Sequence, residues 1–138
     1  MVDKVKQGKQ NRASGLAFER KVRKDLEEKG WIVCKWSNNI DEGKCIPAKH
    51  KFNPFSKVMA MGTGFPDFFA FREDGNSSYH KVYEIFFIEC KSNGYLSKIE
   101  KEKAEWYLKN GYCSQFMIAS KKQEGRKIEV EYKEYGTD

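Results

Sequence analysis

The sequence has no apolar run long enough to cross a membrane, no internal repeat and no low-complexity tract. Its N-terminus is polar and rich in lysine throughout, and so lacks the apolar segment of a signal peptide. We therefore expect a cytoplasmic protein that has no contact with a membrane. At 138 residues the chain is long enough for one domain with a core of its own.

Residues that bind transition metals are also scarce. The chain has 4 cysteines and 2 histidines. No two cysteines form a C-x-x-C pair, and neither histidine has a cysteine or histidine at ligand spacing. This pattern argues against a zinc site. It favours reduced, mostly buried thiols, as in a cytosolic protein.

Positive charge is present in excess, and it is unevenly distributed. The net charge of the whole chain is +6. Residues 1–24 hold eight basic and two acidic side chains, and residues 35–60 hold five basic and two acidic ones. A nucleic-acid backbone is the partner that such clustering suggests, whereas a merely solubilising surface is the alternative. The basic candidates for this contact are Lys4, Lys6, Lys9, Arg12, Lys44, Lys49, Lys51 and Lys57.

The first half of the chain predicts an arm, a helix, a strand and a long connection. Residues 1–12 lack apolar periodicity, and we expect a flexible basic arm there, followed by a single domain over residues 13–138. Ser14 is a suitable N-cap for a helix that ends near Gly30. The nearly continuous apolar segment 31–36 predicts a strand at the centre of a sheet. Residues 37–64 predict a long connection, and its lysines suit contact with phosphates.

The second half predicts a hairpin, a helix and two further strands. One strand runs from about Asp67 to Arg72 and returns as a long strand from Tyr79 to Lys91. A helix follows from an N-cap at Ser97, with Glu100 at the spacing of a capping box. A strand over 114–120 and an alternating edge strand over 127–132 complete an α/β fold, in the order αβββαββ around a mixed sheet.

Three charged side chains mark the two strands of the hairpin. Strand alternation places Glu89 and Lys91 side by side on one face, and Asp67 begins the neighbouring strand. Such charges are costly to bury on apolar strands unless they pair or hold a metal. Two carboxylates that bind Mg²⁺, with a lysine that orients or activates water, form an arrangement that cuts phosphodiester bonds. The alternative is a hairpin whose ends carry a plain salt bridge.

Glu19 is a third carboxylate in an unexpected position. It lies inside the apolar arc that Phe18, Val22 and Leu26 form on the first helix. A carboxylate on a packing face needs a partner. It either pairs with a buried lysine or arginine, or it reaches over the sheet towards Asp67 and Glu89.

Taken together, these features resemble the PD-(D/E)xK nuclease superfamily, and within it archaeal Holliday-junction resolvases and virus-type replication-repair nucleases. The first helix, with Gly15-x-x-x-Glu19-Arg20 and the sequence LEEKGW over residues 26–31, is similar to the opening of the resolvases. The resemblance implies a restriction-endonuclease-like core in which Asp67 and Glu89 ligate Mg²⁺ or Mn²⁺. It also implies that Glu19 is a further acid of the metal site and that Lys91 is the catalytic lysine.

The function expected from this resemblance is a metal-dependent, structure-specific DNA endonuclease. Its substrate would be branched or duplex DNA, and it would act as a homodimer, because two symmetrical cuts need two sites. One alternative is a non-catalytic nucleic-acid-binding protein on the same scaffold; another is a nuclease for single-stranded, flap or specific duplex DNA. The chain departs from the replication-repair nucleases at Lys103, where they often carry a glutamine, and from the resolvases in its longer 37–64 connection.

Overall fold

The computed structural model describes residues 4–48, 50–53, 58–61, 64–76 and 79–136. No helix among these residues is long and apolar enough to span a membrane. In chain order, their elements are α1 (Lys4–Glu28), β1 (Ile32–Lys35), β2 (Asn38–Asp41), β3 (Lys44–Pro47), β4 (His50–Asn53), β5 (Val58–Met61), β6 (Phe68–Asn76), β7 (Lys81–Cys90), α2 (Lys98–Lys109), β8 (Gln115–Glu124) and β9 (Lys127–Glu134).

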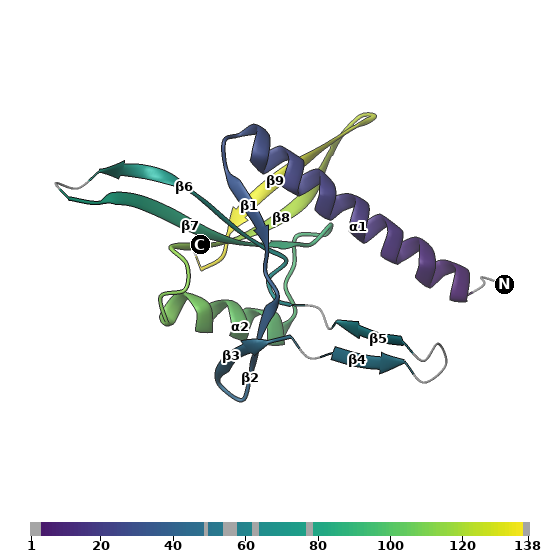
Figure 1. Ribbon diagram of the computed structural model, residues 1–138. Helices are drawn as coiled ribbons and strands as arrows, with labels where there is room; N and C mark the ends of the chain where they lie inside the picture. Colours follow the sequence, from purple (N-terminus) through teal and green to yellow (C-terminus); the bar gives the residue numbers. More distant parts are fainter. Residues whose placement is uncertain (1–3, 49, 54–57, 62–63, 77–78, 137–138) are drawn as a thin grey trace.

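A mixed five-stranded sheet is the centre of the fold. Its strand order is β1-β6-β7-β8-β9, and the single parallel pair of this sheet, β7 with β8, is connected through α2. The pairs β1–β6, β6–β7 and β8–β9 are antiparallel. Helices α1 and α2 lie on opposite faces of the sheet (Figure 1). The expected α/β class, with a mixed sheet between helices, is confirmed.

The two faces of the sheet carry two separate cores, because strand side chains alternate between faces. The core under α1 includes Phe18, Val22, Phe68 and Ile88. The core under α2 consists of other side chains, which include Phe65, Phe87, Tyr107 and Phe116. Neighbouring residues of β7, Phe87 and Ile88, therefore bury their side chains on opposite sides, as the alternation predicts.

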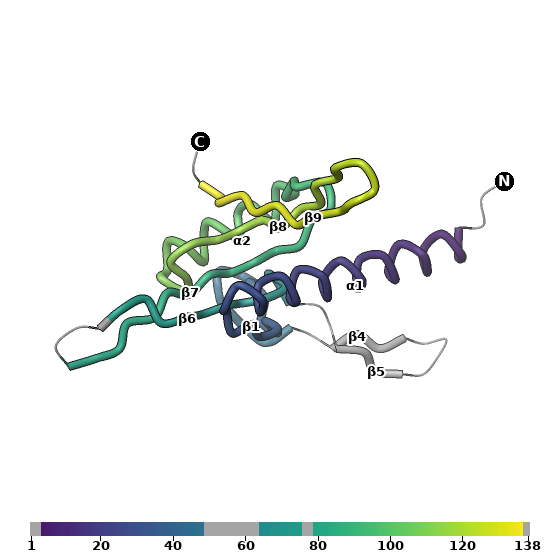
Figure 2. The backbone as a smooth tube through the Cα atoms, turned by 90° about the horizontal axis from the view of Figure 1, so that it is seen from above, coloured from purple at the N-terminus to yellow at the C-terminus, as the bar shows by residue number. Residues whose placement is uncertain are grey.

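The predicted start of the first helix is wrong. Helix α1 begins at Lys4 rather than after Ser14, so residues 4–12, expected to be a flexible arm, are helical. Lysine, glutamine and arginine are good helix formers, and they need no apolar face to continue a helix that is anchored further on. The first buried side chain of α1 is Phe18, and the preceding turns extend beyond the sheet (Figures 1 and 2).

The position of the first strand and the nature of the long connection also differ from expectation. Among the described strands, β1 pairs only with β6, and it lies at the edge of the sheet rather than at its centre. The 37–64 connection contains two antiparallel hairpins, β2–β3 and β4–β5. The first of them turns through Glu42 and Gly43, which both have positive φ, 49° and 71°. This is the backbone that a tight two-residue hairpin needs.

The elements predicted for the second half are confirmed, with shifted ends. Strands β6 and β7 form the expected antiparallel hairpin, and β9 is the expected edge strand. Ser97 caps α2, and its side chain and that of Glu100 form the complete capping box. Strand β8 runs on to Glu124, beyond the predicted end at residue 120, and pairs with β9 along its length.

Candidate functional site

One pocket collects the four residues predicted to carry chemistry. It has a volume of about 410 Å³ and lies where β7 ends and α2 begins. The pocket brings Glu19 from α1 together with Asp67, which precedes β6, and with Glu89 and Lys91 at the end of β7. Its lining residues are Glu19, Asn39, Gly64, Phe65, Asp67, Glu89, Cys90, Lys91, Glu100 and Lys103.

The segment from Gly64 to Asp67 is held against the chain that follows β1. The backbone N–H of Phe65 donates to the Asn38 carbonyl at 2.9 Å, and that of Trp36 donates to the Asp67 carbonyl at 3.1 Å. A Cβ at Gly64 would overlap the carbonyl oxygen of Trp36, so this close approach requires glycine. From the other side, Tyr107 of α2 donates its hydroxyl to the Phe65 carbonyl at 2.7 Å.

Asp67 and Glu89 are fixed by reciprocal hydrogen bonds across the hairpin. The Asp67 backbone N–H donates to Glu89 Oε1 at 3.1 Å, and the Cys90 backbone N–H donates to Asp67 Oδ2 at 2.8 Å. Each bond uses one oxygen of a carboxylate. Glu89 is 6% exposed, and among the described residues it is the only charged one that is buried. Both carboxylates are therefore oriented by backbone groups; Glu89 is withdrawn from water, and Asp67 is half-buried.

Burial and mutual repulsion dominate the electrostatics of these acids. Burial raises the pKa of Glu89 to about 10, assisted by the negative charge of Asp67 and only partly opposed by Lys91. The pKa of Glu19 is also raised, first by burial and then by the charge of Asp67, while Lys35 acts in the opposite direction. Of the two partners considered for Glu19, the structure thus places the acids, rather than a buried base, beside it. Such a cluster favours a bound proton or cation.

Lys91 makes its shortest contact with Glu100 of α2. Its Nζ lies 2.7 Å from Glu100 Oε2 and 3.9 Å from Glu89 Oε2. Burial alone would lower the pKa of Lys91, but the hydrogen bond to Glu100 and the charges of Glu89 and Glu100 raise it. The pKa of Glu100 is lowered, because its bonds to Lys91 and Ser97 outweigh its burial. The ammonium of Lys91 therefore stays charged at neutral pH.

The donor set of the pocket consists of carboxylate oxygens, which are the ligands of hard cations such as Mg²⁺ and Mn²⁺. Across the described residues, no three His, Cys, Asp or Glu side chains are already arranged to hold a metal ion together. Asp67 and Glu89 instead direct one oxygen each at a backbone N–H. Binding of a cation between them would need a reorientation of these side chains.

The predicted nucleic-acid contacts whose side chains are described do not line this pocket. Lys4, Lys6, Lys9 and Arg12 are exposed on the part of α1 that extends beyond the sheet, and Lys44 is exposed on β3. Lys51 belongs to β4, and Lys49 and Lys57 lie outside the described residues. Lys4, Lys6, Lys9, Arg12 and Lys44 are therefore not part of the pocket.

Sequence reasoning missed the contribution of α2 to the pocket. The sequence indicates Glu100 as a capping residue and Lys103 as the counterpart of a glutamine, but it gives neither residue a place in the site. The acid-x-Lys spacing that points to Glu89 and Lys91 does not include Glu100, because the residue two positions after it is Glu102, so this signal could not identify Glu100. Only the docking of α2 beside the end of β7 shows that Glu100 belongs to the site.

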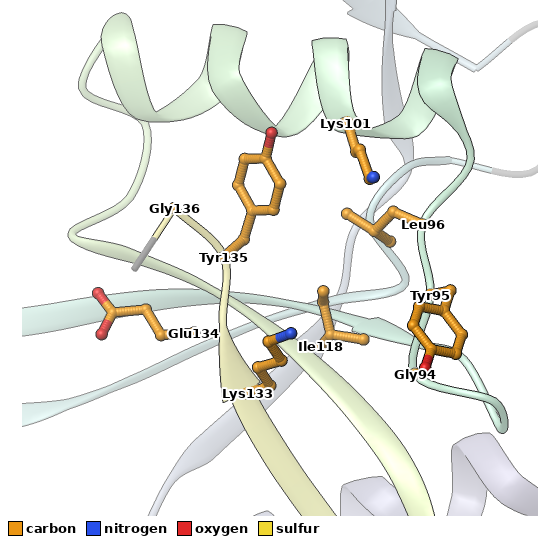
Figure 3. A pocket seen from close by; sticks show the side chains of 9 residues that line it. All are labelled: Gly94, Tyr95, Leu96, Lys101, Ile118, Lys133, Glu134, Tyr135 and Gly136. Carbon is orange, nitrogen blue, oxygen red and sulfur yellow. The ribbon is translucent and has the colours of Figure 1, made fainter. Parts of the chain in front are cut away.

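A second pocket, of about 440 Å³, is lined by residues of α2, of β8 and of the end of β9. Lys101 and Lys133 extend into it over an apolar floor that includes Leu96 and Ile118 (Figure 3). Glu134 is the one acid among its lining residues. The gathering of carboxylates thus distinguishes the first pocket from this one.

Comparisons with protein-family models, with curated proteins and with solved structures found no match to this chain. A function must therefore be inferred from the chemistry of the pocket.

Proposed function

We propose that this chain is a metal-dependent endonuclease that hydrolyses phosphodiester bonds in DNA, with a restriction-endonuclease-like αβββαββ core of the PD-(D/E)xK type. One observation carries the proposal. Glu19, Asp67, Glu89 and Lys91 come from three separate parts of the chain and line one pocket. A plain salt bridge at the end of a hairpin would leave no reason for Glu19 to be there.

The residues present fit a divalent cation held by oxygen ligands. Asp67 and Glu89 would hold Mg²⁺ or Mn²⁺, with Glu19 beside them. The fit is supported by the burial of Glu89 next to other acids, because a cluster of carboxylates withdrawn from water gains most from an added positive charge. When bound, such an ion supplies Lewis-acid stabilisation of the scissile phosphate.

The remaining chemistry belongs to Lys91. Its ammonium keeps its proton at neutral pH, since Glu89 and Glu100 raise its pKa. Lys91 therefore acts as a charged donor that orients water or a phosphate oxygen and neutralises developing negative charge, rather than as a general base. Its side chain is 31% exposed, so a substrate phosphate can reach it.

The exposed basic side chains of α1 suit the DNA backbone. They lie on a helix that extends beyond the sheet, where a long polyanion can follow them (Figure 2). A preference for branched DNA and a homodimer that places two symmetrical cuts are part of the same proposal. A panel of a four-way junction, a flap, a duplex and a single strand would identify the substrate.

Plasmid nicking tests the proposal directly. The wild-type protein should nick DNA when Mg²⁺ or Mn²⁺ is added and only bind it in a chelator, whereas Asp67→Asn should bind without nicking. Asp74→Asn is the matched control, because it makes the same change at an exposed position of β6. A wild-type protein that binds every DNA of the panel and cuts none with either metal is a non-catalytic binder, and the proposal fails.

A further inference from the structure

We infer that Glu100 is a positioning residue for Lys91: it holds the ammonium at the mouth of the pocket and keeps it off the buried carboxylate of Glu89. The inference rests on the proposed function and extends it to helix α2. It assigns to Glu100 a role beyond the cap of its helix.

The distances place Lys91 with Glu100 rather than with Glu89. Lys91 Nζ is 2.7 Å from Glu100 Oε2, whereas Glu89 Oε2 is 3.9 Å away. The side chains of Lys91 and Glu100 are 31% and 20% exposed, so their contact is partly shielded from water. An ion pair of this kind fixes the direction of a long side chain more firmly than a fully solvated pair does.

Glu100 is itself held in place by the start of α2. Its Oε1 accepts from the Ser97 backbone N–H at 2.8 Å, and its own backbone N–H donates to Ser97 Oγ at 3.2 Å. The chain between Lys91 and Ser97 is short and begins with a turn in which the Gly94 N–H donates to the Lys91 carbonyl at 2.8 Å. One carboxylate thus joins the first turn of the helix to the lysine, with one oxygen for each.

Removal of the negative charge at position 100 would change the partner of Lys91. The next carboxylate is that of Glu89, whose Oε2 lies 3.9 Å from Lys91 Nζ and which attracts the ammonium once it has lost its proton. The Lys91 ammonium would then bind Glu89 Oε2 and leave the mouth of the pocket. It would also occupy a carboxylate that the proposed metal needs. Glu100 prevents this by offering a preoriented carboxylate that faces the opening.

Three substitutions separate this role from helix capping. Glu100→Gln keeps an oxygen for the Ser97 N–H, since glutamine also completes a capping box, but removes the charge that holds Lys91. Ser97→Ala removes the cap side chain but keeps the Ser97 backbone N–H that binds Glu100 Oε1. Glu102→Gln is the matched control, because it makes the same charge change at an exposed position of the same helix.

The measurement is cleavage of a saturating DNA substrate at saturating Mg²⁺, together with KM, the Kd for DNA and thermal melting. Glu100→Gln should lower kcat about ten- to a hundredfold, as expected when a reacting group is misplaced by about an ångström, with KM and Kd close to wild type. Glu102→Gln should stay within about twofold of wild type. Ser97→Ala should lower the melting temperature at least as much as Glu100→Gln but leave kcat within about threefold, since it removes only a cap.

A second readout follows Lys91 without cleavage. In protein with ¹⁵N-labelled lysine, the ammonium signal assigned by Lys91→Arg should shift in Glu100→Gln and stay unchanged in Glu102→Gln. Wild-type kcat in Glu100→Gln, or an equal loss of kcat in Ser97→Ala, would overturn the inference while the proposed function stands. If the wild-type protein itself cuts no DNA, the proposed function fails and the inference fails with it.

Discussion

Replacement of Glu89 by Gln tests the electrostatics of the pocket in the absence of any substrate. Glu89 Oε1 accepts the Asp67 N–H, and the amide oxygen of glutamine can do the same. The amide nitrogen can face Asp67, as the protonated acid does. Glu89→Gln is therefore a close mimic of protonated Glu89, and the two proteins should differ where the wild-type acid is forced to ionise.

The sign and size of the effect follow from the shifted pKa. Burial raises the pKa of Glu89 in the folded state from 4.5 to about 10. Between these pH values the folded protein retains a proton that the unfolded chain has lost, so the free energy of unfolding falls as pH rises. The slope is at most about 1.4 kcal/mol per pH unit for one proton. The contribution of protonated Glu89 is fully present below pH 4.5 and is lost progressively towards pH 10.

Thermal melting of both proteins in a chelator, from about pH 5 to about pH 9, measures this slope. Near pH 5 the two melting temperatures should nearly coincide. Their gap should then widen in favour of Glu89→Gln by at most roughly 4–7 °C per pH unit, because about 1 kcal/mol shifts the melting temperature of a domain of this size by roughly 3–5 °C and the slope is at most about 1.4 kcal/mol per pH unit. Mg²⁺ should close the gap by stabilising the wild-type protein alone. Glu129→Gln, at an exposed position of β9, is the control and should follow the wild-type protein at every pH.

Parallel melting curves would refute the reasoning. If the gap between wild type and Glu89→Gln is constant from acid to alkaline pH, Glu89 ionises in the folded state as easily as in water. The carboxylates would then not form the repelling cluster that the pocket implies, and the argument for a cation between them would lose its electrostatic basis.

Three further results are expected. Glu19→Gln should melt at the same or a higher temperature in a chelator and gain less from Mg²⁺, because it relieves repulsion by Asp67; a loss of roughly 3–5 kcal/mol would instead indicate a buried basic partner. Deletion of residues 1–12 should leave the domain folded and reduce the slope of log K against log salt for DNA by roughly 0.9 for each phosphate that these residues neutralise, so an unchanged slope would show that these turns of α1 do not touch DNA. Tyr107→Phe should lower the free energy of unfolding by about 1–3 kcal/mol in a denaturant titration, since it leaves the buried Phe65 carbonyl without its donor, and a wild-type value would show that the hydroxyl does not support this segment.

The central part of the site could be predicted because strands have a short and rigid period. An apolar strand with period two fixes which side chains share a face, and a shift of one residue would bury the wrong set. In the observed register Phe68 pairs with Ile88, which brings Asp67 and Glu89 opposite one another. Phe68 and Ile88 lie in the same core, as their shared face predicts. The period of the strands therefore predicts the face on which each acid lies, whereas the observed pairing determines that the two acids lie opposite one another.

Features that depend on which elements cover a strand, rather than on the alternation of its side chains, could not be predicted from the sequence. The apolar segment before Ser37 predicts a central strand, but β1 is an edge strand in which Val33 is buried while Ile32 is 54% exposed. Trp31 and Val33 pack in the core under α1, while Trp36 packs against the other core together with Ile40 and Cys45 of the β2–β3 hairpin. A sequence reports that a side chain is buried, but it does not say whether a neighbouring strand or an overlying element buries it.

Glu100 shows how a complete local explanation can hide a tertiary role. The Ser97-x-x-Glu100 pattern predicts a capping box, and the structure contains that box. The box uses only one oxygen of the carboxylate, Oε1, for the Ser97 N–H. The direction of Oε2 depends on the turn after Lys91 and on the docking of α2 against the sheet through Ala104 and Tyr107, which no local pattern encodes. A capping-box acid at the third position of a helix therefore has a second carboxylate oxygen that needs its own partner. In this chain that oxygen is Glu100 Oε2, and it lies 2.7 Å from Lys91 Nζ.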